Sequence, residues 1–261
     1  MLGRDRSIWL HVAPAIERLA IQGRKVWTEP AAVQKTLSEF LSVFPVTHVQ
    51  IDLVALSRAH TESEEWGPLL SRAGQWGPLL NELTQAITAA VRSPVVWGLG
   101  LPGPQRIAAS LGDISERGTL KAGLQLASFL QAFRESRISF VAIDLHDTEP
   151  ANLERPIAPI FRNSAMYGWL RAVCIDNLTV RKGSLAGSEV TLVRDTEISA
   201  LRPLWEAGEA VGGGLSDKFW NGGGFDNDLP RKCLLYGEVP EGISPKAIVE
   251  TGRSLRTWVA A

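Results

Sequence analysis

The stretch of residues 95–147 constrains the fold of this chain more than any other. It begins with the apolar run VVWGLGLPGP, continues with a helical pattern as far as Arg137, and ends with the second apolar run SFVAIDLHD. This order is typical of two parallel strands joined by a crossover helix. Because both strands read as continuous apolar runs, we expect helices to cover them. The sequence therefore predicts a parallel α/β fold, in which ligands bind at the carboxyl ends of the strands.

The rest of the chain repeats this alternation of short apolar runs and helical patterns. Six further runs predict strands, at residues 7–12, 48–56, 171–176, 189–193, 210–215 and 232–236. Between and after them, apolar spacing predicts helices at residues 30–44, 78–92, 156–168, 198–209 and 244–259. Eight strands alternating with helices favour a single (β/α)8 barrel, the TIM barrel, over residues 1–261. Short or missing outer helices are expected after strands five and seven, and residues 216–228 have the composition of a loop.

Composition excludes several classes of partner. The chain has 27 basic and 28 acidic residues, and a formal charge of −1 is no electrostatic footprint for nucleic acid or for an acidic membrane surface. No segment approaches the roughly 18 uninterrupted apolar residues that span a bilayer. Cys174 and Cys233 match no CxxC spacing, so neither a disulfide framework nor a structural zinc motif is indicated. We expect a cytoplasmic protein whose partner is a small-molecule substrate.

Three segments resemble one family when they are taken in order. GLPGPQRIAASLGD precedes a helix and VAIDL, AVGGGLSDKFW follows, and LLYGEVPEGISPKAIVETGRSL comes last. Together they resemble the superfamily of uroporphyrinogen decarboxylase and cobalamin-independent methionine synthase, over most of the chain from residue 95 onward. The resemblance implies a (β/α)8 barrel with its site at the carboxyl ends of the strands. It also implies methyl or alkyl transfer, or decarboxylation, of a small molecule.

The zinc ligands of that superfamily are not all present. Its zinc-dependent methyltransferases carry a His-x-Cys pair on a strand, whereas this chain reads Ala172-Val173-Cys174 there. Cys233 falls at the start of the last predicted strand, away from the expected site. A catalytic zinc site needs three protein ligands, and Cys174 is the one candidate that can be assigned. The cofactor is therefore left unknown.

Two further departures concern the chemistry. The decarboxylases of the superfamily use an arginine-rich N-terminal loop, but Arg4 and Arg6 precede the first strand and would lie at the opposite end of the barrel. Relatives on the methionine-synthase side continue the Ile-Asp pair with Glu-Pro, where this chain has Leu145-His146-Asp147. We expect the chemistry to differ at this point.

The best catalytic candidates are Asp144, His146 and Asp147. They place three polar groups within four residues, directly after a fully apolar strand. Alternation along a strand puts Asp144 and His146 on the same side. A histidine beside carboxylates has its charged form favoured, which suits a general acid near neutral pH.

Other candidates stand at the predicted strand exits, which converge on one face of a barrel. The predicted substrate-binding residues are His11, Asp52, Gly103, Asp176, Arg194, Asp195, Trp220, Tyr236 and Glu238. Trp220 lies in the segment FWNGGGFDND, which is typical of a mobile flap that covers a ligand. Arg194 is the arginine available at a strand exit to hold a substrate carboxylate.

Three hypotheses of function remain open. The first is an enzyme of this superfamily, a transferase that moves methyl or alkyl groups without the standard zinc site. The second is a lyase that decarboxylates a small acid. The third is a non-catalytic binding or assembly protein on an eroded barrel, in which a second copy or a partner protein covers the sheet flanks.

Overall fold

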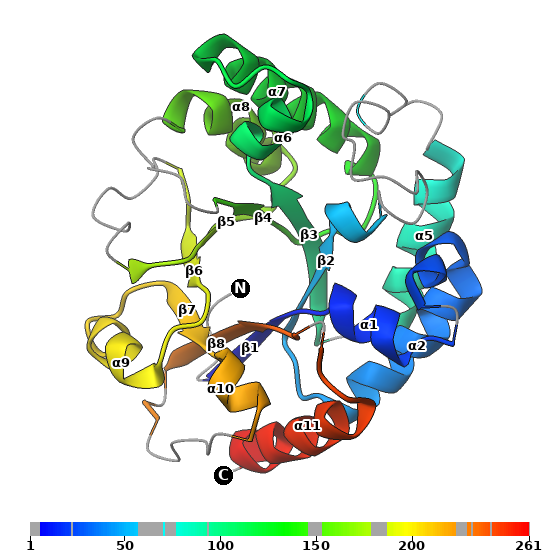
Figure 1. Ribbon diagram of the computed structural model, residues 1–261, viewed down its shortest axis with the longest axis vertical. Coiled ribbons are helices and arrows are strands. Elements are labelled where there is room, and N and C mark those ends of the chain that lie inside the picture. Colours follow the sequence, from blue (N-terminus) through cyan, green and yellow to red (C-terminus); the bar gives the residue numbers. More distant parts are fainter. Residues whose placement is uncertain are drawn as a thin grey trace.

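Eight parallel strands close into a barrel in the computed structural model, in the order in which they follow along the chain (Figure 1). The structure describes residues 6–21, 23–56, 70, 77–92, 94–145, 153–178, 187–222, 229–230, 232–240 and 242–260. The strands are β1 (Arg6–His11), β2 (His48–Asp52), β3 (Val96–Pro102), β4 (Phe140–Asp144), β5 (Leu170–Ile175), β6 (Val190–Val193), β7 (Val211–Gly214) and β8 (Cys233–Glu238). The predicted (β/α)8 barrel is confirmed.

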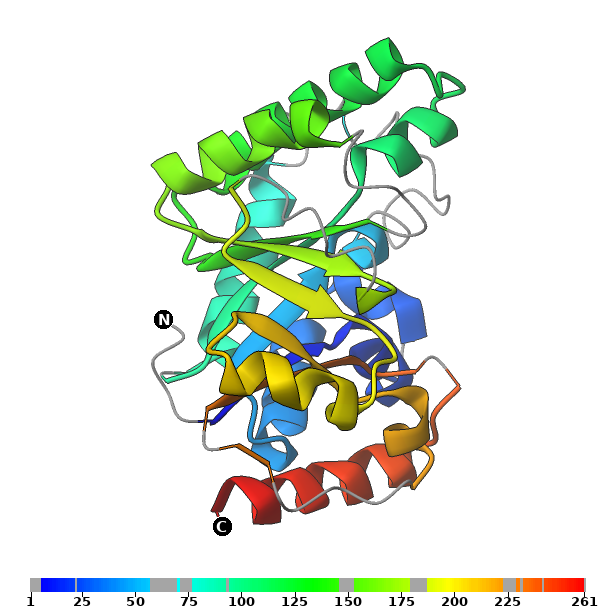
Figure 2. The same ribbon diagram turned by 90° about the vertical axis from the view of Figure 1, so that its left-hand side faces the viewer.

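Helices surround the barrel, as Figures 1 and 2 show from two sides. They are α1 (Ala13–Leu19), η1 (Gly23–Thr28), α2 (Pro30–Val43), α5 (Gly77–Ala90), α6 (Pro104–Ser110), α7 (Glu116–Phe129), η2 (Leu130–Phe133), α8 (Glu154–Met166), α9 (Ile198–Glu206), α10 (Asp217–Trp220) and α11 (Pro245–Ala260). Within the described ranges, none of these helices combines the length and apolar character that crossing a membrane requires.

The crossover between β3 and β4 differs from the single long helix that the sequence predicts. The chain forms α6 and α7 instead, with a break at residues 111–115. Gly112 adopts a left-handed conformation there (φ 77°). Ser115 then caps α7, because its hydroxyl oxygen accepts a hydrogen bond from the backbone N–H of Gly118 at 3.0 Å. Local capping thus outweighs the helical periodicity.

Other element boundaries were also predicted incorrectly. β2 ends at Asp52, and residues 53–56 are helical rather than extended. Residues 217–220 form the short helix α10 within the predicted loop; its four residues confirm the expected thin outer layer after the seventh strand. After the fifth strand, residues 179–186 lie outside the described part of the chain. β8 continues to Glu238, so Tyr236 lies inside the strand and not at its exit.

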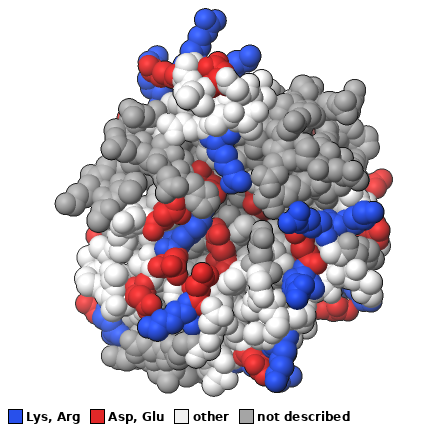
Figure 3. Space-filling model, viewed as in Figure 1, with Lys and Arg blue, Asp and Glu red and all other residues white. Residues whose placement is uncertain are grey.

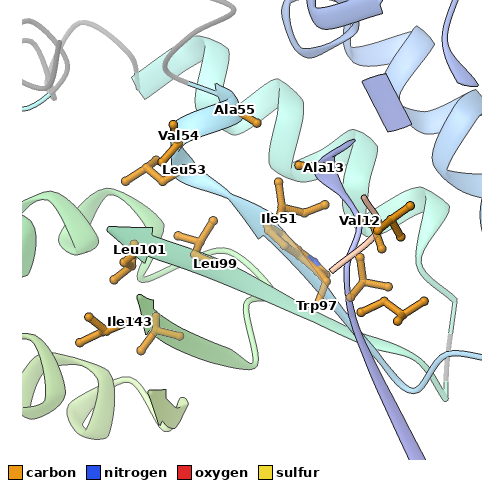
Figure 4. Packing of buried hydrophobic residues seen from close by; sticks show 14 of the residues in the cluster. Val12, Ala13, Ile51, Leu53, Val54, Ala55, Trp97, Leu99, Leu101 and Ile143 are labelled. Atoms are coloured by element: carbon orange, nitrogen blue, oxygen red, sulfur yellow. The ribbon is translucent and has the colours of Figure 1, made fainter. Parts of the chain in front are cut away.

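Two apolar layers hold the barrel together. The outer layer lies between the strands and the helices, where residues such as Ile51, Leu99 and Ile143 pack (Figure 4). The inner layer fills the barrel itself with Trp9, Phe140 and other buried side chains. Because the inner side chains close the barrel interior, a ligand can reach only its ends. Figure 2 shows that the strands run toward one end, which faces the viewer in Figure 1.

Candidate active site

Charged side chains meet at the carboxyl ends of the strands. Each one stands two residues after a side chain of the barrel interior, so alternation turns it inward as well. The group comprises His11, Asp52, Asp144, Asp176, Arg194 and Glu238, from six different strands or the residues directly after them. We call these six residues the mouth cluster. Figure 3 shows acidic side chains gathered around basic ones near the centre of this face.

Arg194 holds the centre of the mouth cluster. Its Nη2 lies 2.6 Å from Oδ1 of Asp144, its Nη1 lies 2.8 Å from Oδ1 of Asp176, and its Nε lies 2.8 Å from Oε1 of Glu238. The side chain is only 12% exposed. Each of its three nitrogens therefore donates to a carboxylate of the protein, and the guanidinium ties together the ends of β4, β5 and β8.

Glu238 is held in place through one of its oxygens. Oε1 accepts hydrogen bonds from Arg194 and, at 2.9 Å, from the hydroxyl of Tyr236. Burial alone would raise the pKa of Glu238, but the neighbouring His11 and Arg194 outweigh it and lower the pKa well below its usual range. Glu238 is therefore a carboxylate throughout the neutral range.

His11 lies between two carboxylates. It stands opposite Glu238 across the β1–β8 pair, with Nδ1 at 3.6 Å from Oε1 of Glu238 and Nε2 at 3.7 Å from Oδ2 of Asp52. These separations suit ion pairs but are too long for hydrogen bonds. Burial favours the neutral ring, yet Glu238 and Asp52 more than offset it and raise the pKa of His11 above 6.5. His11 is therefore able to carry a proton near neutral pH.

The pKa of Asp52 is shifted in the opposite direction to that of Glu238. Its Oδ1 accepts the backbone N–H of Val54 at 2.7 Å, and its side chain is 25% exposed. Burial raises the pKa of Asp52 above 3.8, against the charge of His11 and the Val54 hydrogen bond, which lower it. Two carboxylates whose pKa values are driven apart thus face the two nitrogens of one imidazole.

Cys174 and Tyr236 lie one layer deeper, below the mouth cluster. The Cys174 thiol donates to the Tyr236 hydroxyl at 2.8 Å, and the hydroxyl donates to Glu238. Both side chains are fully buried, and burial raises the pKa of both. Cys174 is therefore a neutral thiol, and Tyr236 contacts Glu238 rather than the open mouth.

The remaining predicted site residues are placed less directly. His146 and Asp147 lie outside the described residues, so their catalytic role stays a prediction. Asp195, in a left-handed conformation (φ 39°), accepts the backbone N–H of Asp217 at the start of α10. Trp220 is 2% exposed and packs against Phe44 and Phe219; its role as a cover for substrate also stays a prediction.

Gly103 directly follows β3, where the chain passes close to the backbone of Asp144. A Cβ atom at this position would lie 2.5 Å from the backbone oxygen of Asp144, closer than real Cβ contacts allow. We therefore expect Gly103→Ala to lower the free energy of unfolding by about 1–3 kcal/mol, because the backbone has to shift. Urea unfolding followed by tryptophan fluorescence measures this change. Gly242→Ala is the control, since a Cβ there meets nothing within 4 Å; equal effects of the two substitutions would contradict the close approach.

The chain was also compared with known proteins. No protein-family model and no curated protein matches it. What the structure supports of the resemblance is therefore the fold, a closed barrel of eight parallel strands. Barrels of this kind serve many unrelated reactions, and the residues of the site have to carry any argument about chemistry.

The donor set of the mouth cluster does not fit the superfamily's zinc site. Among the residues that the structure describes, no group of three or more His, Cys, Asp or Glu side chains is arranged to hold a metal ion. Three carboxylates that could serve as ligands are already paired with Arg194, and Cys174 keeps its proton. Cys233 lies at the amino end of β8, as expected, and burial raises its pKa to about 11.

The sequence predicts all six members of the mouth cluster as site residues, but it does not predict which of them contact one another. We expected Asp144 and the two residues near it to form the centre, whereas Arg194 occupies that place in the described structure. One signal was present in the sequence. Arg194 is a single basic residue among many strand-exit acids, and a buried arginine in such a position needs carboxylate partners.

Proposed function

We propose that this protein is an enzyme that transfers protons to and from a small organic substrate at the mouth of the barrel. One observation carries the proposal: Asp52 and Glu238 face opposite nitrogens of His11, and their surroundings drive the two pKa values apart. Pairs of titratable groups with opposed pKa shifts mark acid and base in enzymes of several folds. In TIM-barrel enzymes the active site lies at this end of the barrel.

The roles follow from exposure and charge. Asp52 has the raised pKa and part of its side chain open to solvent, so it exchanges the proton with the substrate. Glu238 stays ionised and stabilises positive charge that is present or develops in the substrate. His11 is a positioning residue: its ring nitrogens are buried, and its ring lies between the carboxylates of Asp52 and Glu238, so its charge acts on both.

The two reactions implied by the resemblance fit this site to different degrees. Alkyl transfer is compatible where Asp52 protonates the leaving group, but the thiol of Cys174 is buried and neutral and is no nucleophile at the mouth. Decarboxylation would need a cation to hold the substrate acid. Arg194 already shares its single charge with three carboxylates of the protein, which disfavours a further acid at this arginine.

The proposal is tested by incubating the protein in D2O with a panel of small alcohols, ketones, amines and amino alcohols. Mass spectrometry then detects both new products and deuterium incorporated at carbon. We expect turnover of at least one compound, and a rate that changes with pH when it is measured from about pH 4 to pH 8, because the pKa values of Asp52 and His11 are both raised. Turnover that is independent of pH across this range would contradict proton transfer by the mouth cluster.

A further inference from the structure

The mouth cluster contains more negative than positive charge. Four carboxylates, those of Asp52, Asp144, Asp176 and Glu238, stand against Arg194 and His11, so these six side chains together carry a net charge of −2 even when His11 is protonated. One negative charge remains when Asp52 is protonated as well. An excess of one charge at such a place attracts ligands of the opposite charge.

Glu238 offers this charge to a ligand through one particular atom. Its Oε1 accepts hydrogen bonds from Arg194 and Tyr236 and also lies 3.6 Å from Nδ1 of His11. Its Oε2 forms no hydrogen bond with any side chain or backbone group among the described residues, and the Glu238 side chain is 34% exposed. A carboxylate oxygen can accept two hydrogen bonds, so Oε2 is available to a donor that enters the mouth.

His11 independently indicates that this space takes a ligand. The residue is 9% exposed, and neither ring nitrogen has a hydrogen-bond partner in the part of the chain that the structure describes. Its two nitrogens face Asp52 and Glu238, which line the mouth. Buried polar atoms are nearly always satisfied in folded proteins, and exceptions call for a bound group or a functional role.

We propose that the mouth binds a small organic cation, such as a protonated amine, whose nitrogen donates to Oε2 of Glu238. This inference rests on the proposed function and names the class of its substrate. Because its pKa is lowered, Glu238 stays charged throughout the neutral range, in which an alkylamine is also protonated. An acidic molecule would instead meet three carboxylates around an arginine that is already paired.

Binding of matched probes tests the proposal on the whole protein. The probes are 1,4-diaminobutane, 1,4-butanediol and succinate, which share a four-carbon chain and differ in charge. Binding is followed by NMR of the histidine ring protons, with His11 assigned from a His11→Asn spectrum, and by calorimetry at low and high salt. We expect the diamine to bind with an affinity that falls as salt rises, and to shift the His11 signals, while the diol and the acid do neither.

Substitutions separate the site from a general charge effect. Glu238→Gln should weaken diamine binding at least tenfold, since it removes the charge but keeps the shape. Glu189→Gln is the control: Glu189 also pairs with an arginine, Arg171, but at the amino end of the barrel, and its loss should leave binding unchanged. Should Glu238→Gln fail to fold by circular dichroism, Asp176→Asn replaces it, with the same expectation of weaker binding.

The outcomes distinguish this inference from the proposed function. Binding of succinate in preference to the diamine, or diamine binding that survives the carboxylate substitution, would overturn the cation proposal. Deuterium incorporation by the wild type could still stand in that case. Conversely, selective diamine binding without any pH-dependent turnover would support the cation site and remove the enzymatic role.

Discussion

Replacing Arg194 with alanine should lower the free energy of unfolding by about 3 kcal/mol or more. The guanidinium lies within 2.8 Å of oxygens from Asp144, Asp176 and Glu238, so its removal leaves three carboxylates facing one another in a half-buried space. Breaking a buried ion pair by deleting one partner typically costs about 3–5 kcal/mol, and part-exposure of the carboxylates places the expectation at the lower end. Denaturant unfolding at pH 7 measures the loss.

A surface pair provides the matched control for this substitution. Arg155 pairs with Glu116 at 3.2 Å, but both side chains are largely exposed. Exposed pairs contribute less than about 1 kcal/mol, so Arg155→Ala should change stability little. A loss for Arg194→Ala no greater than that for Arg155→Ala would show that the guanidinium does not organise the mouth.

The Arg194→Ala deficit should also shrink on acidification. The folded-state pKa of Glu238 is lowered, so its pairing contributes stability above the unfolded pKa of about 4.5 and loses it as pH falls through the folded value. Without Arg194 the pKa of Glu238 rises, and protonation relieves the repulsion between carboxylates. The difference in unfolding free energy between wild type and variant should therefore be smaller at pH 4 than at pH 7. A constant difference would assign the loss to packing alone.

Replacing Asp52 with asparagine should abolish most of the activity without unfolding the protein. Proton transfer by a positioned side chain contributes about a hundredfold to ten-thousandfold, and an amide cannot supply it. We therefore expect kcat for the substrate found in D2O to fall by a factor in that range, with KM changed much less. Asp113→Asn is the control, because Asp113 is an exposed aspartate bonded to Ser115 between α6 and α7.

Asp52→Asn should not lower stability at neutral pH, although it lowers activity. The folded-state pKa of Asp52 is raised, so the native protein binds this proton more tightly than the unfolded chain does, and stability falls as pH rises through that range. Asparagine removes this dependence. At pH 7 the variant should be as stable as the wild type or more stable, and its pH dependence above about pH 4 should be flatter. A clearly destabilised variant at pH 7 would indicate a structural role for the Asp52 carboxylate.

The fold was predictable because its signal is local and repeated. Apolar runs that end at polar residues, separated by helical spacing, occur eight times, and that count and order favour a closed parallel sheet over an open one. Local errors arose where two signals competed. Gly112 follows the end of one helix and Ser115 caps the start of the next, inside a periodic apolar pattern. Residues 217–220 form a helical turn, which the glycine-rich sequence after it obscures.

The site was predictable as a set but not as an arrangement. Strand exits converge in any parallel barrel, which brought His11, Asp52 and Glu238 together from opposite ends of the sequence. Which carboxylate pairs with Arg194, and which lies beside His11, depends on barrel closure and on the order of neighbouring strands. Burial raises the pKa of Asp52, and His11 and Arg194 lower that of Glu238; both effects depend on the folded arrangement, so composition and spacing could not indicate them.

The two cysteines allow the opening of the barrel to be followed by thiol labelling. Cys174 lies beneath the carboxyl-end mouth and Cys233 at the amino end of β8, and both thiols are buried. A thiol reagent can reach Cys174 only when the strands around it separate, because local opening precedes modification, whereas Cys233 lines a surface pocket beside β7 and β8. A labelling time course resolved by peptide mass therefore follows the opening of the barrel around Cys174, with Cys233 as the more accessible internal reference.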